Sequence, residues 1–263
     1  MLFRQIVFYS LLVGIVSGLV LTAIQAWQVV PIIQGAEFYE EGAGAVEVAV
    51  IPALEQATHT HGDAEEWAPA DGFQRTAFTL LSNVITAMGF AMIIMVAMVA
   101  SLNLQRSNVN RLDWRHGLIW GAAGYVVFWL APAVGLPPEI PLQVAAPLEQ
   151  RQLWWVFAAL CTAGGLAGLA FASSPWRWIA PAALIVPHLV GAPHPEGPMF
   201  GQQPPEVASA LEALAQQFLG ATAIANGALW LVLGLTSAWA VQRMVVSMKA
   251  AASRHEDIEA PLV

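Results

Sequence analysis

The feature that most constrains this chain is a set of long stretches without a charged side chain. Five runs of 20 to 28 residues contain no Asp, Glu, Lys or Arg, and they cover residues 6–33, 78–102, 117–136, 153–172 and 218–241. A helix needs about 20 mainly apolar residues to cross a bilayer, and it must satisfy its own backbone hydrogen bonds there. We therefore predict an all-α integral membrane protein in which these runs are transmembrane helices.

A sixth run, 178–192, is also uncharged but shorter, and it contains Pro181, Pro187 and His188. Because proline interrupts helical hydrogen bonding, this run could be a broken spanning helix or a re-entrant element. The distribution of charge favours a crossing. We predict a bundle of about six transmembrane helices, of which the fifth is short and broken by proline.

Lys and Arg collect at the cytoplasmic ends of membrane helices. Six crossings with a cytoplasmic N-terminus place eight of the ten basic residues inside and fourteen of the eighteen acidic residues outside. The two outer basic residues are then Arg75 and Arg151. Without a crossing at 178–192, the acidic segment 196–212 would lie inside and Arg243 would lie outside. Basic and acidic residues would then no longer be separated across the membrane.

The predicted organisation follows from this topology. A membrane domain covers residues 1–248, and its outer segment 34–77 is acidic and contains histidines. Residues 249–263 form a short cytoplasmic tail. We predict a multi-pass protein of the cell (inner) membrane with both termini in the cytoplasm.

Small residues four positions apart permit close approach of membrane helices. Three such pairs occur inside the predicted helices, and they are Gly14 with Gly18, Gly117 with Gly121, and Gly164 with Gly168. We interpret all three as packing positions.

Several functions are disfavoured by composition and by missing motifs. The formal net charge is −8 and the basic residues are scattered, so nucleic acid is not an expected partner. The single lysine, Lys249, has no glycine-rich segment before it, and the H-E-x-x-H pattern of zinc hydrolases is absent. Cys161 is the only cysteine, which excludes an intrachain disulfide. We therefore do not expect an enzyme, and no resident cofactor is indicated.

Histidines and carboxylates on the outer side indicate a metal cation instead. Imidazole suits divalent transition metals such as cobalt, nickel and zinc, and carboxylate can complete a mixed nitrogen and oxygen site. The sharpest candidate is the turn that contains His188, His194 and Glu196, where glycine and prolines stop a regular helix. The alternative is that His188 packs at a helix end and His194 is a solvated loop residue.

A second candidate lies in the long outer segment, where His59 and His61 are followed by acidic residues. Such a stretch can raise the local cation concentration at a pore mouth, or it can be an ordinary solvated loop. Glu37 and Glu40 follow the first helix and could line the same vestibule, although ordinary interfacial polar residues would also fit this position.

Three strongly polar side chains lie inside the predicted helices, namely Gln25, Asn83 and Asn226. All three fall in the outer halves of their helices, so they could line a shared polar path entered from outside. Hydrogen bonding between helices explains them equally well.

The order and spacing of several motifs resemble the CbtA family, the membrane subunit of the proposed CbtAB cobalt transporters. The motifs are Val29-Val30-Pro31-Ile32-Ile33, Ala36-Glu37-Phe38-Tyr39-Glu40, Arg75-Thr76, Gly117-Leu118-Ile119-Trp120-Gly121, Leu130-Ala131-Pro132, Gly135-Leu136-Pro137-Pro138-Glu139, Arg151-Gln152-Leu153-Trp154-Trp155 and Pro187-His188 through Gly191-Ala192-Pro193-His194-Pro195. The resemblance implies Co²⁺ uptake together with a small partner, CbtB, which has one membrane helix and its own histidines. It also implies five helices, where the charge distribution gives six.

Our prediction is that outer acids and histidines gather the cation, and that the turn at His188, His194 and Glu196 passes it towards the polar helix residues. No carboxylate lies inside the predicted helices, so we expect the membrane potential to drive uptake, with about 4 to 5 kcal/mol for a 2+ ion at 100 mV. The alternative is a non-transporting metal-sensing or assembly subunit. In either case the chain could also form a homo-oligomer.

Overall fold

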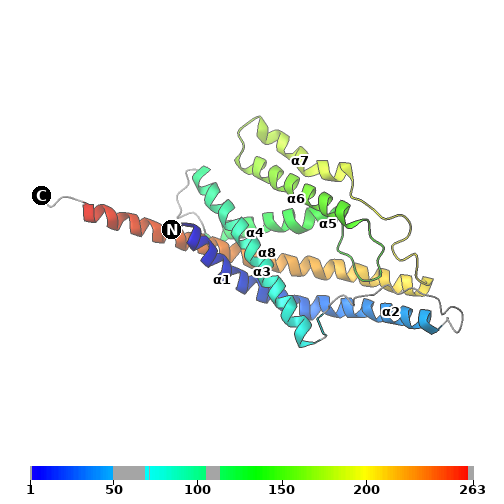
Figure 1. Ribbon diagram of the computed structural model, residues 1–263. Coiled ribbons are helices and arrows are strands. Elements are labelled where there is room, and N and C mark those ends of the chain that lie inside the picture. The colour runs from blue at the N-terminus through cyan, green and yellow to red at the C-terminus, as the bar shows by residue number, and fades with distance from the viewer. Residues whose placement is uncertain (1, 50–68, 71, 105–112, 260–263) are drawn as a thin grey trace, which may run out of the picture.

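The computed structural model describes residues 2–49, 69–70, 72–104 and 113–259, and this part of the chain is helical without any strand (Figure 1). The helices, in order, are α1 (Leu2–Ile24), η1 (Gln25–Val29), α2 (Val30–Ala49), α3 (Phe73–Leu104), α4 (Trp114–Tyr125), η3 (Val126–Leu130), α5 (Ala131–Gly135), α6 (Leu148–Phe171), α7 (Trp176–Val190) and α8 (Pro205–Glu259). The predicted all-α fold is confirmed.

Five helical stretches are long and apolar enough to cross a membrane, and they contain the five long uncharged runs. They cover Leu2–Glu40, Phe73–Leu102, Trp114–Gly135, Leu148–Phe171 and Pro205–Met248. The sixth run forms α7, whose 15 residues rise about 22 Å, less than the roughly 30 Å of a hydrocarbon core. Six crossings therefore stay a prediction.

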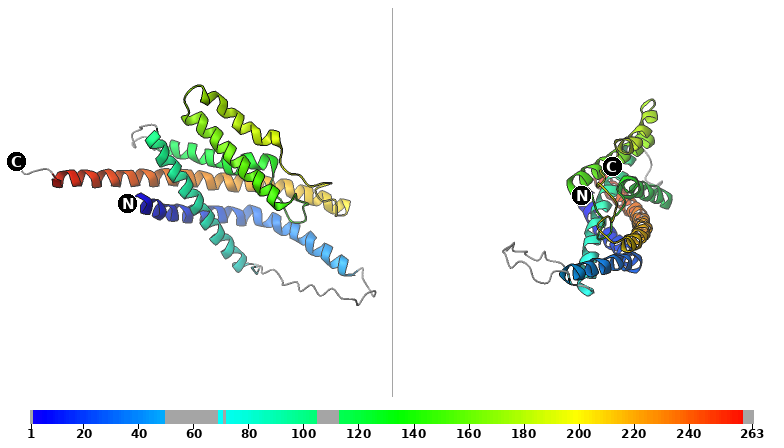
Figure 2. Two further views of the ribbon diagram at one scale, coloured as in Figure 1. Left: turned by 45° about the horizontal axis from the view of Figure 1, so that its top comes forward. Right: turned by 90° about the vertical axis from the view of Figure 1, so that its right-hand side faces the viewer.

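The helices run in alternating directions, so that α1 begins and α8 finishes at one end of the bundle (Figures 1 and 2). We call this the N-terminal end. At the opposite end α5 and α7 stop and α6 and α8 begin. We call it the outer end, because the charge distribution predicts that it faces outward.

The bundle is built around α8, against which α1, α3 and α4 pack. Its side chains at Leu233, Val241 and Met244 are fully buried. Helices α6 and α7 form a hairpin that packs beside this group, and α6 meets it through η3 and α5 (Figure 1). The core therefore extends along most of α8 and leaves the α6–α7 hairpin at one side.

Glycines bring two of the helix pairs into backbone contact. A Cβ atom at Gly14 or Gly18 would lie 2.8 Å from the Cα atom of Met88 or 2.7 Å from that of Val84, so α1 and α3 cross there. Gly117 packs in the same way against Gly234 of α8. Two of the three predicted glycine pairs therefore pack as expected.

In the third predicted pair, Gly168 is a packing position but Gly164 is not, and the neighbouring Gly165 takes its place. A Cβ atom at Gly164 would meet no atom within 4 Å, whereas one at Gly165 would clash with Leu184 of α7 and one at Gly168 with Ala180. The prediction for Gly164 was wrong because glycine spacing alone does not indicate which face of α6 meets α7.

Two helices contain a π-helical turn in front of a proline. The N–H of Val30 donates to the carbonyl of Gln25, just before Pro31, and the N–H of Ala131 donates to that of Val126, just before Pro132. Proline lacks an N–H and crowds the preceding turn, and a wider turn accommodates it. Both π turns lie towards the outer end and both contact α8.

Candidate functional site

A bidentate ion pair joins α2 to α3 at the outer end. Arg75 Nη2 donates to Glu37 Oε1 at 2.6 Å, and Nη1 donates to Oε2 at 3.1 Å. The two side chains are 30% and 32% exposed, so solvent screens the pair only in part. We call this the first corner. Glu40, one turn further along α2, is exposed.

A second ion pair, between Glu139 and Arg151, joins the loop after α5 to the first turn of α6. These side chains are also about one quarter exposed. A pocket of about 480 Å³ opens beside them, and Pro137, Pro138 and Trp155 form part of its wall. We call this the second corner.

The two corners repeat one arrangement of residues. In each, a π turn is followed by a proline, a glutamate lies six or seven residues after that proline, and an arginine in the first turn of the next long helix binds the glutamate. The two arginines are the ones that the topology assigned to the outer side. Each corner thus neutralises one outer acid with one outer base.

The third outer connection, from α7 to α8, departs from this arrangement. Residues 188–196, which we call the histidine turn, follow a regular helical segment, and the first turn of α8 holds Glu206 and no arginine. His188, His194 and Glu196 are all exposed. Within the described residues Glu196 makes no ion pair, so its charge faces solvent uncompensated.

The histidine turn is shaped by two glycines. Helix α7 continues through Pro187 and stops at Gly191, whose φ of 82° is a left-handed value that favours glycine. Gly197 has a φ of 93° and ends the turn. We predicted that prolines and glycine would stop the helix here, but Gly191 does so and Pro187 lies buried inside α7.

Trp154 connects the histidine turn to the second corner. Its ring is 6% exposed and meets the imidazole of His188 edge to face, with 6.1 Å between the ring centroids. A Cβ atom at Gly135 would lie 2.6 Å from Cζ2 of the same ring and 3.0 Å from the Cβ atom of Ala192. His188 therefore packs at a helix end while its ring remains accessible.

The described residues contain no group of three His, Cys, Asp or Glu side chains placed to hold one metal ion. The structure thus leaves His188, His194 and Glu196 on one turn without gathering them into a ligand cluster. His59 and His61 lie outside the described residues. Metal binding at any of these five positions stays a prediction.

Of the three polar residues inside the helices, Gln25 and Asn83 are hydrogen-bonded to each other, and Asn226 bonds elsewhere. Asn83 Nδ2 donates to Gln25 Oε1 at 2.6 Å and to Thr22 Oγ1 at 2.9 Å, which joins α3 to α1 and η1. Asn226 instead donates to the carbonyl of Thr222 on its own helix at 2.9 Å. The Gln25 side chain is partly exposed, in the first residue of the π turn.

Aromatic rings fill the bundle interior below this link. Phe90 of α3, Phe128 of η3 and Trp230 of α8 lie with ring centroids 4.8 to 5.3 Å apart, and Trp230 is 2% exposed. These rings join α3, η3 and α8 through apolar contacts at this level. A cation passing between these three helices would require them to separate.

The N-terminal end carries a different kind of pair. Asp113 caps α4 by accepting from the N–H groups of Arg115 and His116, and its carboxylate lies 2.8 Å from His116 Nδ1. The hydrogen bond from the His116 side chain is the main reason that the pKa of Asp113 lies below its usual value. Both side chains are nearly half exposed.

The sequence analysis did not identify Glu139 and Arg151 as site residues and treated them only as charges. Both residues belong to motifs that carry the family resemblance, and these motifs could have indicated a role for them. Trp154 belongs to one of these motifs too, and it packs between the second corner and the histidine turn.

The fold and the outer end define a class, namely a helical multi-pass membrane protein with structured polar corners on one side. A family model described as "Probable cobalt transporter subunit (CbtA)" matches residues 3–242. The chain therefore belongs to the CbtA family. No curated protein and no solved structure matches it.

Proposed function

We propose that this chain is the membrane subunit through which Co²⁺ is taken up, and that the histidine turn is where the ion first binds. One observation carries the proposal. Of the three outer connections, two hold a glutamate neutralised by arginine. The third exposes Glu196, two residues after His194, and has no arginine in the first turn of α8. A cation is attracted to an unneutralised carboxylate and not to one already paired.

Beyond the turn, the ion would move towards the outer halves of α1 and α4. Pro31 and Pro132 leave the carbonyls of Trp27 and Phe128 without their usual helical partners, and transporters often use such interrupted helices to coordinate cations. Gln25 adds an amide oxygen to the first of these interruptions. His59, His61 and Glu40 would raise the cation concentration around the entrance, whereas Glu37 is already neutralised by Arg75.

Passage past the aromatic rings requires a driving force and a conformational change. The membrane potential supplies about 4 to 5 kcal/mol for a 2+ ion at 100 mV. The family description names a subunit, which implies a partner. A small single-helix protein of the CbtB type, with histidines of its own, is the partner that we propose, and uptake across the cell (inner) membrane is the direction.

The proposal is tested by uptake of ⁵⁷Co in cells that produce the chain with its partner. We expect His188→Ala together with His194→Ala to lower initial uptake at limiting cobalt by at least tenfold, with unchanged protein in the membrane. His116→Ala, which removes a histidine at the other end, is the matched control and should transport normally. Uptake by the double variant at the wild-type rate would refute this site.

A second function is favoured by the closed aromatic interior. With Phe90, Phe128 and Trp230 packed together, the chain could sense or assemble without conducting an ion itself. Purified protein in liposomes, with an imposed potential and a cobalt-sensitive dye inside, separates the two functions. Flux without a partner supports transport by this chain, whereas metal binding without flux, even with the partner present, supports the sensing or assembly role.

A further inference from the structure

We infer that the groove between α1 and α3 at the N-terminal end binds an anionic phospholipid, with its phosphate at Arg4 and an acyl chain along the helix crossing. The inference is independent of cobalt transport. It rests on the way the two helices diverge, on the chemistry of the groove and on the surroundings of Arg4.

The groove exists because α1 and α3 diverge from the place where they cross. Gly14 and Gly18 hold the crossing against Met88 and Val84, and from there towards the N-terminal end the two helices separate (Figure 1). The ten residues from Arg4 to Gly14 rise about 15 Å, which is half of a hydrocarbon core of roughly 30 Å. The separation therefore has the depth of one lipid leaflet.

The walls of the groove are almost entirely hydrocarbon, and Arg4 is the one charged residue among those that line it. The space of about 450 Å³ is lined by Phe3, Arg4, Val7, Phe8 and Leu11 of α1 and by Met88 of α3. Phe3 is 78% and Phe8 58% exposed, so the described chain leaves these rings uncovered. An apolar groove with one arginine among its lining residues suits a lipid that has an acyl chain and an anionic phosphate.

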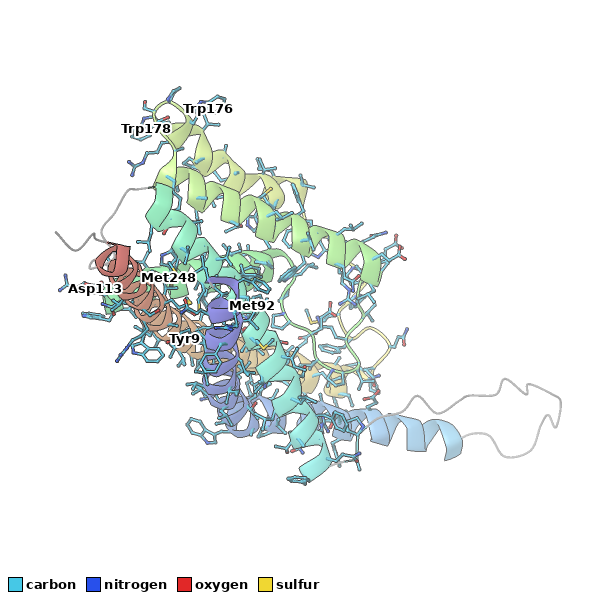
Figure 3. All side chains as sticks on the ribbon, turned by 60° about the vertical axis from the view of Figure 1, so that its left-hand side comes forward. Tyr9, Met92, Asp113, Trp176, Trp178 and Met248 are labelled. Atoms are coloured by element: carbon cyan, nitrogen blue, oxygen red, sulfur yellow. The ribbon has the colours of Figure 1, made fainter. Side chains whose placement is uncertain are left out.

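The surroundings of Arg4 differ from those of other arginines at the same end. Arg115 and Arg243 each lie over a tryptophan ring of their own helix, 5.5 Å and 5.7 Å from the centroid. Arg177 lies between Trp176 and Trp178 in the sequence, and these two tryptophans are at the tip of the α6–α7 hairpin (Figure 3). Arg4 is exposed and makes no ion pair within the described residues, so its guanidinium remains available for an anion.

Native mass spectrometry of the full chain in detergent tests the inference by titration with phosphatidylglycerol and with phosphatidylcholine. We expect phosphatidylglycerol to bind more tightly than phosphatidylcholine. Arg4→Gln should weaken phosphatidylglycerol binding about fivefold, since one basic residue at a membrane surface contributes about 1 kcal/mol. Arg177→Gln, at the same end without a groove, is the matched control and should bind as the wild type does.

A second variant tests the groove apart from the charge. Val7→Trp fills the apolar space while Arg4 stays, and it should lower binding of both lipids if the chain enters the groove. Equal binding of the two lipids by the wild type, or wild-type affinity in both variants, would overturn the inference. So would a photo-crosslinker at Leu11 that captures a protein helix in membranes in place of lipid, because a helix would then occupy the groove.

Discussion

The two corners and the histidine turn occupy equivalent places in the fold, yet they differ in charge. Each corner follows a π turn and a proline, and each buries most of an ion pair that holds two helices together. The histidine turn follows a regular helix, has no arginine, and exposes its carboxylate and both imidazoles. The difference suggests a division of labour, in which the corners maintain the structure of the outer end and the turn binds the ion.

The largest expected effect is on transport, when the exposed carboxylate of the histidine turn is removed. Glu196→Gln should lower ⁵⁷Co uptake at limiting cobalt by about tenfold to thirtyfold, because a 2+ ion about 4 Å from a carboxylate in water is attracted by roughly 2 kcal/mol. Glu206→Gln, which removes another exposed outer acid, is the control and should have a small effect. If both variants transported equally well, the turn would not be the binding site.

The next largest effect is on stability and concerns the corners. Arg151→Gln leaves the carboxylate of Glu139 partly buried and unpaired, which should lower the free energy of unfolding by about 1 to 3 kcal/mol. Thermal unfolding in detergent measures the change. The double variant Glu139→Gln with Arg151→Gln should recover part of the loss, since neither charge is then left alone.

Glu196→Gln supplies the matched comparison in the same unfolding experiment and should leave stability almost unchanged. A loss of stability in Glu196→Gln as large as in Arg151→Gln would show that the turn is a third structural corner.

A smaller effect is expected from the polar link between α1 and α3. Asn83→Ala removes two hydrogen bonds between helices, which contribute about 0.6 kcal/mol each in membrane proteins. Asn226→Ala removes only a bond to its own helix and serves as the control in the same unfolding experiment. If Asn83→Ala instead reduced cobalt uptake strongly without changing stability, the link would belong to the ion path and not to packing.

The smallest effect concerns the exposed pair at the N-terminal end and is a pH dependence. Because the pKa of Asp113 is lowered on folding, its hydrogen bonds stabilise the start of α4 above the ordinary value of 3.8 and are lost as the pH falls through the lowered value. Amide exchange in the first turn of α4, corrected for the intrinsic rate, should therefore rise in acid. Asp113→Asn should remove this dependence, and its persistence in that variant would assign it to another group.

The membrane helices could be predicted because their signal is local. Runs without charge identify a bilayer-spanning helix whatever it packs against, and the structure has a long apolar helix at each of the five runs. Their ends were less well predicted. Residues 34–49 were assigned to an outer segment but continue the first helix, and α8 extends from 205 to 259 where we predicted 218–241. Charged residues do not stop a helix that emerges into water.

The corners could not be derived from sequence spacing. Glu37 and Arg75 are 38 residues apart and Glu139 and Arg151 are 12 apart, so no helical or strand period relates them. The choice of Gly165 over Gly164 depends likewise on which face of α6 meets α7. The same holds for the link between Gln25 and Asn83, which was proposed as a path and as a contact with equal weight. Such pairings depend on how each helix is rotated relative to its neighbours, and residue spacing within one helix does not determine that rotation.

The length of α8 has a mechanical consequence. Its 55 residues rise about 80 Å, well over twice the thickness of a hydrocarbon core, and it contacts both π turns near one end and α4 further along. A helix of this length, in backbone contact with α4 at Gly234 near its middle, can transmit a tilt from one end to the other. A tilt of a few degrees where α8 follows the histidine turn would displace its far end by several ångströms. Ion binding at the outer end would then change the position of the other end of α8 without any large rearrangement.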